Sequence, residues 1–196
     1  MEKVNANSMC DAGVIRRPSN LEEAFAHGTY AVSCRNSLGE LQWEDTVNNV
    51  VTYEGKNLAL NTFLAGSGYT VVGPFIGLIS SISYGAGPVI GDTMGSHAGW
   101  YEVSATTYFP TVAARLTTNA NWAASSNGTK ALTAPVSFTI ITNPGIVKGC
   151  FLVYGSGAVA TLGSALGTLY SAGTFTGGDK TVGVGDTLQV SYTAGL

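Results

Sequence analysis

The last 140 residues of the chain combine short apolar runs with very few charges. They carry eight charged side chains, whereas the first 56 of the 196 residues carry 13. Glycine accounts for 26 residues of the whole chain, and Gly-rich segments separate the apolar runs. Short runs bounded by such turns are typical of β-strands, because helices usually need longer uninterrupted periods. The pattern therefore predicts a mostly β fold.

Alternation of apolar and polar residues is clearest near the C-terminus. Within residues 187–193 every second side chain is large and apolar, which predicts a strand with one buried face. We expect further strands over 71–80, 100–109, 112–118, 136–142, 146–154 and 168–171. Asn143-Pro144-Gly145 is a tight-turn sequence that would join two of these strands. This spacing predicts an antiparallel β-sandwich or jelly-roll-like single domain.

The N-terminal part of the chain has a different character. Residues 1–20 are small, polar and aperiodic, so we expect an extended arm in front of a β-rich body over residues 21–196. Ser19 and Glu22 form a capping-box pattern, which predicts a short helix over residues 19–27.

A more charged hairpin is predicted over residues 28–53. Its strands would cover 29–35 and 40–46, with a turn at Asn36-Ser37-Leu38-Gly39, because Asn and Gly tolerate positive φ. A second short helix is expected over residues 56–65, where four large apolar residues fall within three turns.

Charge and cysteine content exclude several classes of function. The net charge is -3 and the basic residues are scattered, so we expect no direct contact with nucleic acid. No run approaches the ~18 apolar residues of a membrane span, and no secretory signal is apparent. Cys10, Cys34 and Cys150 lack metal-ligand spacing, so we expect reduced, buried thiols. The chain is predicted to be assembled in a reducing cytoplasm.

One loop contains residue types that occur in catalytic triads. Asp92, Ser96 and His97 are close in sequence, but no Gly-x-Ser-x-Gly elbow accompanies them. We interpret the segment as a loop whose His97 and Trp100 make local contacts. The chain offers no metal-ligand spacing and no clustered carboxylates. We therefore expect no catalytic residue, no metal and no cofactor, and predict that the protein is not an enzyme.

The low charge also bears on the surface. Only 11% of the residues are charged, against about 25% in an average soluble protein. The surface must then be covered by small polar residues or by another protein. Such a surface is typical of chains that function inside an assembly.

Five segments resemble small virion proteins of tailed bacteriophages. They are 46–57, with the pattern Asn-x-Val-Thr-x-x-Gly-Lys-Asn, together with 77–80, 92–100, 169–173 and 185–193. Members of that kind are similar to capsid decoration, or cement, proteins. The resemblance implies a structural protein on the capsid exterior, with the major capsid protein and copies of itself as partners. The N-terminal arm would supply the capsid contact, through Val14, Ile15, Arg16 and Arg17.

Two alternatives remain open from the sequence. The chain could be a tail, neck or tail-fibre component of the same phage, although no repeat or coiled-coil stem is present. It could also be a glycan-binding β-sandwich module, since the tryptophan and tyrosine side chains could stack on sugars.

Overall fold

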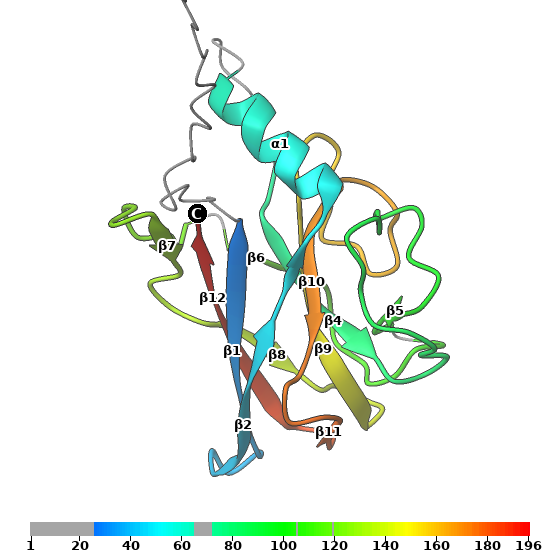
Figure 1. The fold of residues 1–196 in the computed structure, drawn as a ribbon. Coiled ribbons are helices and arrows are strands. Elements are labelled where there is room, and N and C mark those ends of the chain that lie inside the picture. The colour runs from blue at the N-terminus through cyan, green and yellow to red at the C-terminus, as the bar shows by residue number, and fades with distance from the viewer. Residues whose placement is uncertain (1–25, 65–71, 105, 119) are drawn as a thin grey trace, which may run out of the picture.

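The computed structural model describes residues 26–64, 72–104, 106–118 and 120–196. These residues form two antiparallel β-sheets that pack face to face, with one short helix at one end (Figure 1). The mostly β sandwich predicted from the sequence is confirmed. The predicted arm over residues 1–20 lies outside the described residues.

The first sheet is built around the two long terminal strands of the described chain. In its order β2-β1-β12-β7, β8 also pairs with β12. The bounds are β1 (His27–Arg35), β2 (Leu41–Asn48), β7 (Thr129–Ala131), β8 (Val136–Thr139) and β12 (Thr187–Gly195). The β1–β2 hairpin is confirmed. Its turn is closed by Asn36, whose Oδ1 accepts hydrogen bonds from the backbone N–H groups of Leu38 (3.0 Å) and Glu40 (2.9 Å).

The second sheet follows the order β3-β10-β9-β4-β5, with β11 on β9 and β6 on β4. Its strands are β3 (Val50–Val51), β4 (Phe75–Ser80), β5 (Tyr101–Glu102), β6 (Leu116–Thr117), β9 (Gly145–Tyr154), β10 (Thr168–Thr174) and β11 (Lys180–Val182). Both faces of this sheet are covered. Leu78 and Leu152 face the first sheet, whereas Ile79 and Phe151 belong to a separate cluster under the long loops.

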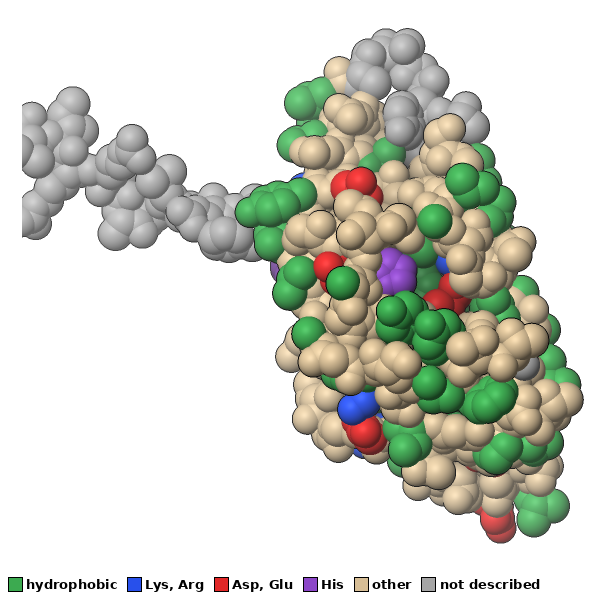
Figure 2. All heavy atoms as spheres, turned by 90° about the vertical axis from the view of Figure 1, so that its right-hand side faces the viewer, with side chains coloured by type: hydrophobic (Ala, Val, Ile, Leu, Met, Phe, Trp, Pro, Cys, Tyr) green, Lys and Arg blue, Asp and Glu red, His purple; other side chains and the backbone are tan. Residues whose placement is uncertain are grey.

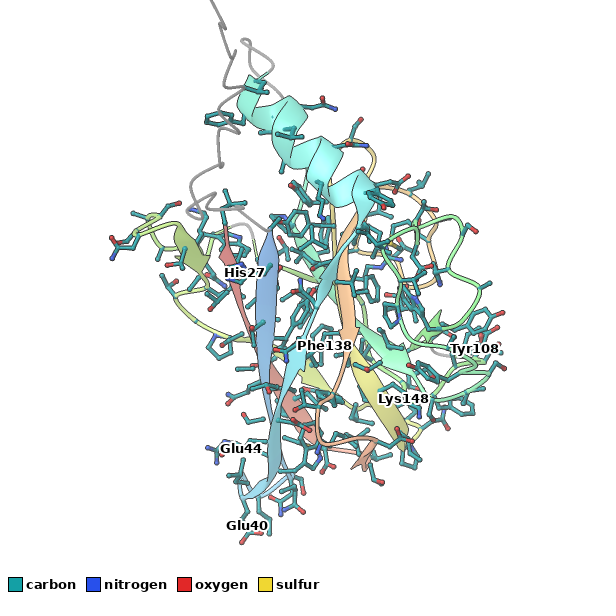
Figure 3. The ribbon with its side chains drawn as sticks, viewed as in Figure 1. His27, Glu40, Glu44, Tyr108, Phe138 and Lys148 are labelled. Carbon is teal, nitrogen blue, oxygen red and sulfur yellow. The ribbon has the colours of Figure 1, made fainter. Side chains whose placement is uncertain are left out.

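The main core lies between the two sheets. Alternate residues of β1 and β12, such as Val32 and Val190, are buried against residues of β4 and β9. Phe138 of β8 projects into the same layer (Figure 3). Tyr30 bridges the sheets, because its hydroxyl lies 2.8 Å from Ser171 Oγ. The hydroxyl groups of Tyr30 and Ser171 are therefore hydrogen-bonded to each other inside this core.

Three local predictions need correction. Asn143-Pro144-Gly145 joins consecutive strands, but β8 and β9 belong to different sheets and do not pair. The strands expected over 100–109 and 112–118 shrink to two residues each. The other described residues of these ranges lie outside strands: Trp100 packs in the cluster under the long loops, whereas Val103 and Val112 pack in the main core.

The helix predictions have different outcomes. Most of the helix predicted over 19–27 lies outside the described residues, but its last residue, His27, begins β1. The second helix is confirmed as α1 (Tyr53–Leu64). It starts three residues earlier than predicted because Thr52 caps it: Thr52 Oγ1 accepts a hydrogen bond from Gly55 N–H at 3.0 Å.

Candidate functional site

Helix α1 carries apolar residues on two opposite sides. Gly55 and Leu58 are buried on the side that contacts the second sheet. Four large apolar side chains on the other side are exposed by 56% to 84% of their surface: Tyr53, Leu60, Phe63 and Leu64. Spacings of three, four and seven residues place these four on one face. We call them the helix stripe.

The start of α1 is held firmly against the second sheet. Thr52 donates its backbone N–H to Tyr170 O (3.0 Å) and its hydroxyl to Leu169 O, so the helix cap is attached to β10. At Gly55 a side chain would overlap the backbone of Tyr170, and its absence allows close approach. The later turns of α1 project beyond the end of the sheets (Figure 1). The start of α1 is therefore anchored on β10, whereas most of the stripe lies on the turns beyond the sheets.

A segment with two exposed apolar residues is hydrogen-bonded to the start of α1. The backbone N–H of Tyr53 donates to Ile90 O at 2.9 Å. Val89 and Ile90 are themselves exposed. Single exposed apolar residues are ordinary, but a contiguous set marks a surface that contacts another molecule. Figure 2 shows the loop-covered side of the molecule, on which hydrophobic and uncharged atoms predominate.

Although Glu54 and Lys56 lie on α1 itself, several charged residues lie at the opposite end, around the β1–β2 hairpin. Glu40 and Glu44 lie there, far from α1 (Figure 3). Lys180 Nζ lies 2.7 Å from Asp45 Oδ2, which ties β2 to β11. Burial alone would raise the pKa of Asp45. Hydrogen bonds from Lys180, Thr176 and two backbone N–H groups outweigh it and hold that pKa well below its usual value.

The outer face of the first sheet is small and polar. It has a shallow concavity of about 450 Å³. Its lining includes Ala31, Ser33, Thr46, Gln189 and Ser191. This agrees with the expectation that small polar residues cover much of the surface.

A second concavity, of about 370 Å³, lies where the loops cover the second sheet. A buried ion pair forms part of its wall. Arg115 donates from Nε and Nη2 to the two oxygens of Glu102, each at 2.8 Å. Arg115 Nη2 also donates to Ser164 O (2.7 Å), and the Gly163 N–H donates to Glu102 Oε2 (2.6 Å). The pair thus joins β5 to the segment before β6 and to the loop after β9.

The Asp92–Trp100 loop closes on itself. Asp92 Oδ2 accepts from Trp100 Nε1 at 2.8 Å, and the His97 ring stacks on the Trp100 ring with centroids 4.0 Å apart. His97 Nδ1 lies 2.8 Å from Trp100 O. The local contacts predicted for His97 and Trp100 are confirmed.

Cys34 and Cys150 are buried free thiols, as predicted, and Cys10 lies outside the described residues. Burial raises the pKa of Cys34 to about 11, with a smaller contribution from Asp186, so this thiol stays protonated at neutral pH. Within the described part of the chain, no group of three His, Cys, Asp or Glu side chains is placed to hold a metal ion. Among those residues, no helix has the length and hydropathy of a membrane span.

Comparisons with protein-family models, with curated proteins and with solved structures found no match.

The predicted contact residues Val14, Ile15, Arg16 and Arg17 lie outside the described residues, so their role stays a prediction. The helix stripe was not predicted as a site. A signal for it was present, because Leu58 and Leu60 are two positions apart and cannot share one helical face. The partnership of Glu102 with Arg115, thirteen residues apart, left no recognisable pattern in the sequence.

Proposed function

We propose that this chain is a structural virion protein of a tailed bacteriophage, which binds the outside of the capsid and stabilises contacts between major capsid subunits. The helix stripe is the observation that carries the proposal. It exposes four large apolar side chains on the surface of a chain that has few charges. The five segments that resemble phage virion proteins support a phage particle as the assembly to which the chain belongs.

The stripe suits a helix-in-groove contact. In this mode an apolar helical face inserts side chains at intervals of three, four and seven residues into a partner's groove. Phe63 is the most exposed member of the stripe, at 84%, and would be its main anchor. We expect the groove to belong to the major capsid protein, with copies of this chain as further neighbours.

The N-terminal arm would make a second, chemically different contact. Val14 and Ile15 would insert as an apolar pair, and Arg16 and Arg17 would meet carboxylates on the shell. Salt separates the two contributions, because it screens exposed charge pairs but leaves apolar burial intact. Binding that persists in high salt would therefore come from apolar contacts such as the stripe.

The test is the copy number in purified particles. Quantitative mass spectrometry of intact virions should find hundreds of copies per particle, as a shell component requires. A count of a few up to tens would favour the runner-up, a tail, neck or tail-fibre component. Absence of the chain from mature virions would refute a structural role in the particle.

A further inference from the structure

The 370 Å³ concavity on the second sheet has the composition of a small-molecule site. It lies between residues 94–104 and 106–108 on one side and the loop around Gly163 on the other, and its size falls within the usual range of ligand pockets. It does not overlap the helix stripe, because the two sets share no residue. The capsid contact proposed above therefore does not involve the residues that line this concavity.

The ion pair in the wall carries no net charge. Both oxygens of Glu102 accept from Arg115, whose side chain is fully buried. Three further hydrogen bonds, with Val159 O, Ser164 O and Gly163 N–H, occupy most of the remaining donors and acceptors of the pair. A phosphate or carboxylate would compete with Glu102 for the guanidinium, and a cation would compete with Arg115. The lining thus favours an uncharged ligand.

Aromatic rings and hydroxyl groups make up much of the rest. Trp100 and Phe151 are fully buried beneath the concavity, so the rings that a ligand could contact are those of the partly buried His97, Tyr101 and Tyr108. Figure 3 places Tyr108 at the outer edge of the molecule. Ser104, Thr106 and Ser164 add hydroxyl groups to the lining. A suitable ligand must then offer both an apolar face and several hydrogen-bonding groups.

We propose that this concavity binds a neutral sugar. A pyranose ring has C–H faces that pack on aromatic rings and hydroxyl groups that match the polar lining. The Tyr101 and Tyr108 rings stack on each other, with centroids 4.4 Å apart and an interplanar angle of 4°, so each ring has at most one face left for a ligand. On a particle with many copies, weak single sites would add up to firm attachment to surface glycans.

Saturation-transfer NMR on the full chain tests this directly. The probes are the methyl glycosides of glucose, galactose, mannose, rhamnose and N-acetylglucosamine. At least one should receive saturation, with an affinity on the order of 1 mM. Tyr108→Ala and His97→Ala should each weaken that binding about tenfold, since each removes one aromatic contact. Tyr53→Ala, which removes an exposed ring on the helix stripe, should leave it unchanged.

Thr106→Arg provides a second variant in case a ring deletion disturbs the loops. Thr106 is an exposed lining residue, so the long charged side chain should obstruct the concavity without entering the core. It should abolish saturation transfer. Transfer to none of the five glycosides would overturn the proposal. So would binding that survives Tyr108→Ala, His97→Ala and Thr106→Arg alike. Neither outcome touches the capsid proposal, which depends on copy number in the particle.

Discussion

The two ends of the sandwich differ in whether their side chains have partners within the described chain. At the hairpin end, Asp45 pairs with Lys180 and Lys148 pairs with Asp179, so these charges find partners within the chain. At the α1 end, the helix stripe leaves large apolar side chains without a partner among the described residues. This difference makes the α1 end the surface that we propose contacts another molecule.

A substitution in the core between the two sheets should have the largest effect on the free energy of unfolding. Phe138 is only 2% exposed and packs between the sheets. Phe138→Ala removes its contacts and leaves a cavity, so the free energy of unfolding should fall by about 3–5 kcal/mol. Urea denaturation measures this. Ser137→Ala, on the exposed side of the same strand, should change it by less than about 0.5 kcal/mol. A loss below about 1 kcal/mol for Phe138→Ala would show that the sheets are not held by this layer.

The two faces of α1 offer a matched pair of substitutions. Leu58 is 5% exposed and Leu60 is 56% exposed. Leu58→Ala should lower the free energy of unfolding by about 2–4 kcal/mol, because it removes the buried anchor of the helix. Leu60→Ala should lower it by less than about 0.5 kcal/mol. Urea denaturation of both variants decides the matter. Equal losses would mean that the stripe belongs to the fold after all.

The hairpin end should show a smaller, pH-dependent effect. The pKa of Asp45 is lower in the folded chain than the unfolded value of about 3.9, so its ionised form stabilises the fold. That contribution is fully present above about pH 4 and is lost as the pH falls through the lower, folded-state value.

Asp45→Asn should therefore cost about 1 kcal/mol at pH 7, and less as the pH falls below about 4. Urea denaturation at pH 7 and pH 3 measures the difference between the variant and the wild type. Glu44→Gln, at an exposed neighbouring carboxylate, is the control and should have little effect at either pH. A deficit of equal size at both pH values would contradict the role given to the ionised carboxylate.

The sequence predicted the long elements well and the short ones poorly. β1, β9 and β12 have seven or more residues each and a strong pattern or apolar content, so the fold class followed from them. β7 and β11 have three residues each and are rich in Thr and Lys, which local patterns do not distinguish from turns. Which strands pair with one another could not be predicted from the sequence either. The Asn143-Pro144-Gly145 turn looks the same whether it closes a hairpin or crosses between sheets.

The candidate site illustrates the same limit. The apolar residues of α1 were recognised, but only the position of β10 determines that Leu58 is covered while Leu60 and Phe63 are not. The Glu102–Arg115 pair depends on how β5, the segment before β6 and a distant loop meet, which no local pattern encodes. Burial and pairing across sheets are tertiary properties, whereas periodicity is a local one.

The most direct test of the account is binding of stripe variants to capsids that lack this protein. Phe63→Asp places a charge at the most exposed position of the stripe, and Asn61→Asp places one at an exposed position off the stripe on the same helical turn. Both charges lie near the C-terminal end of α1 and share its dipole penalty.

Co-sedimentation and a thermal unfolding scan would be measured on both proteins. The account predicts that Asn61→Asp binds like the wild type, whereas Phe63→Asp binds at least about tenfold more weakly, with midpoints within about 2 °C of each other. Wild-type binding by Phe63→Asp would contradict the claim that the helix stripe is the contact surface.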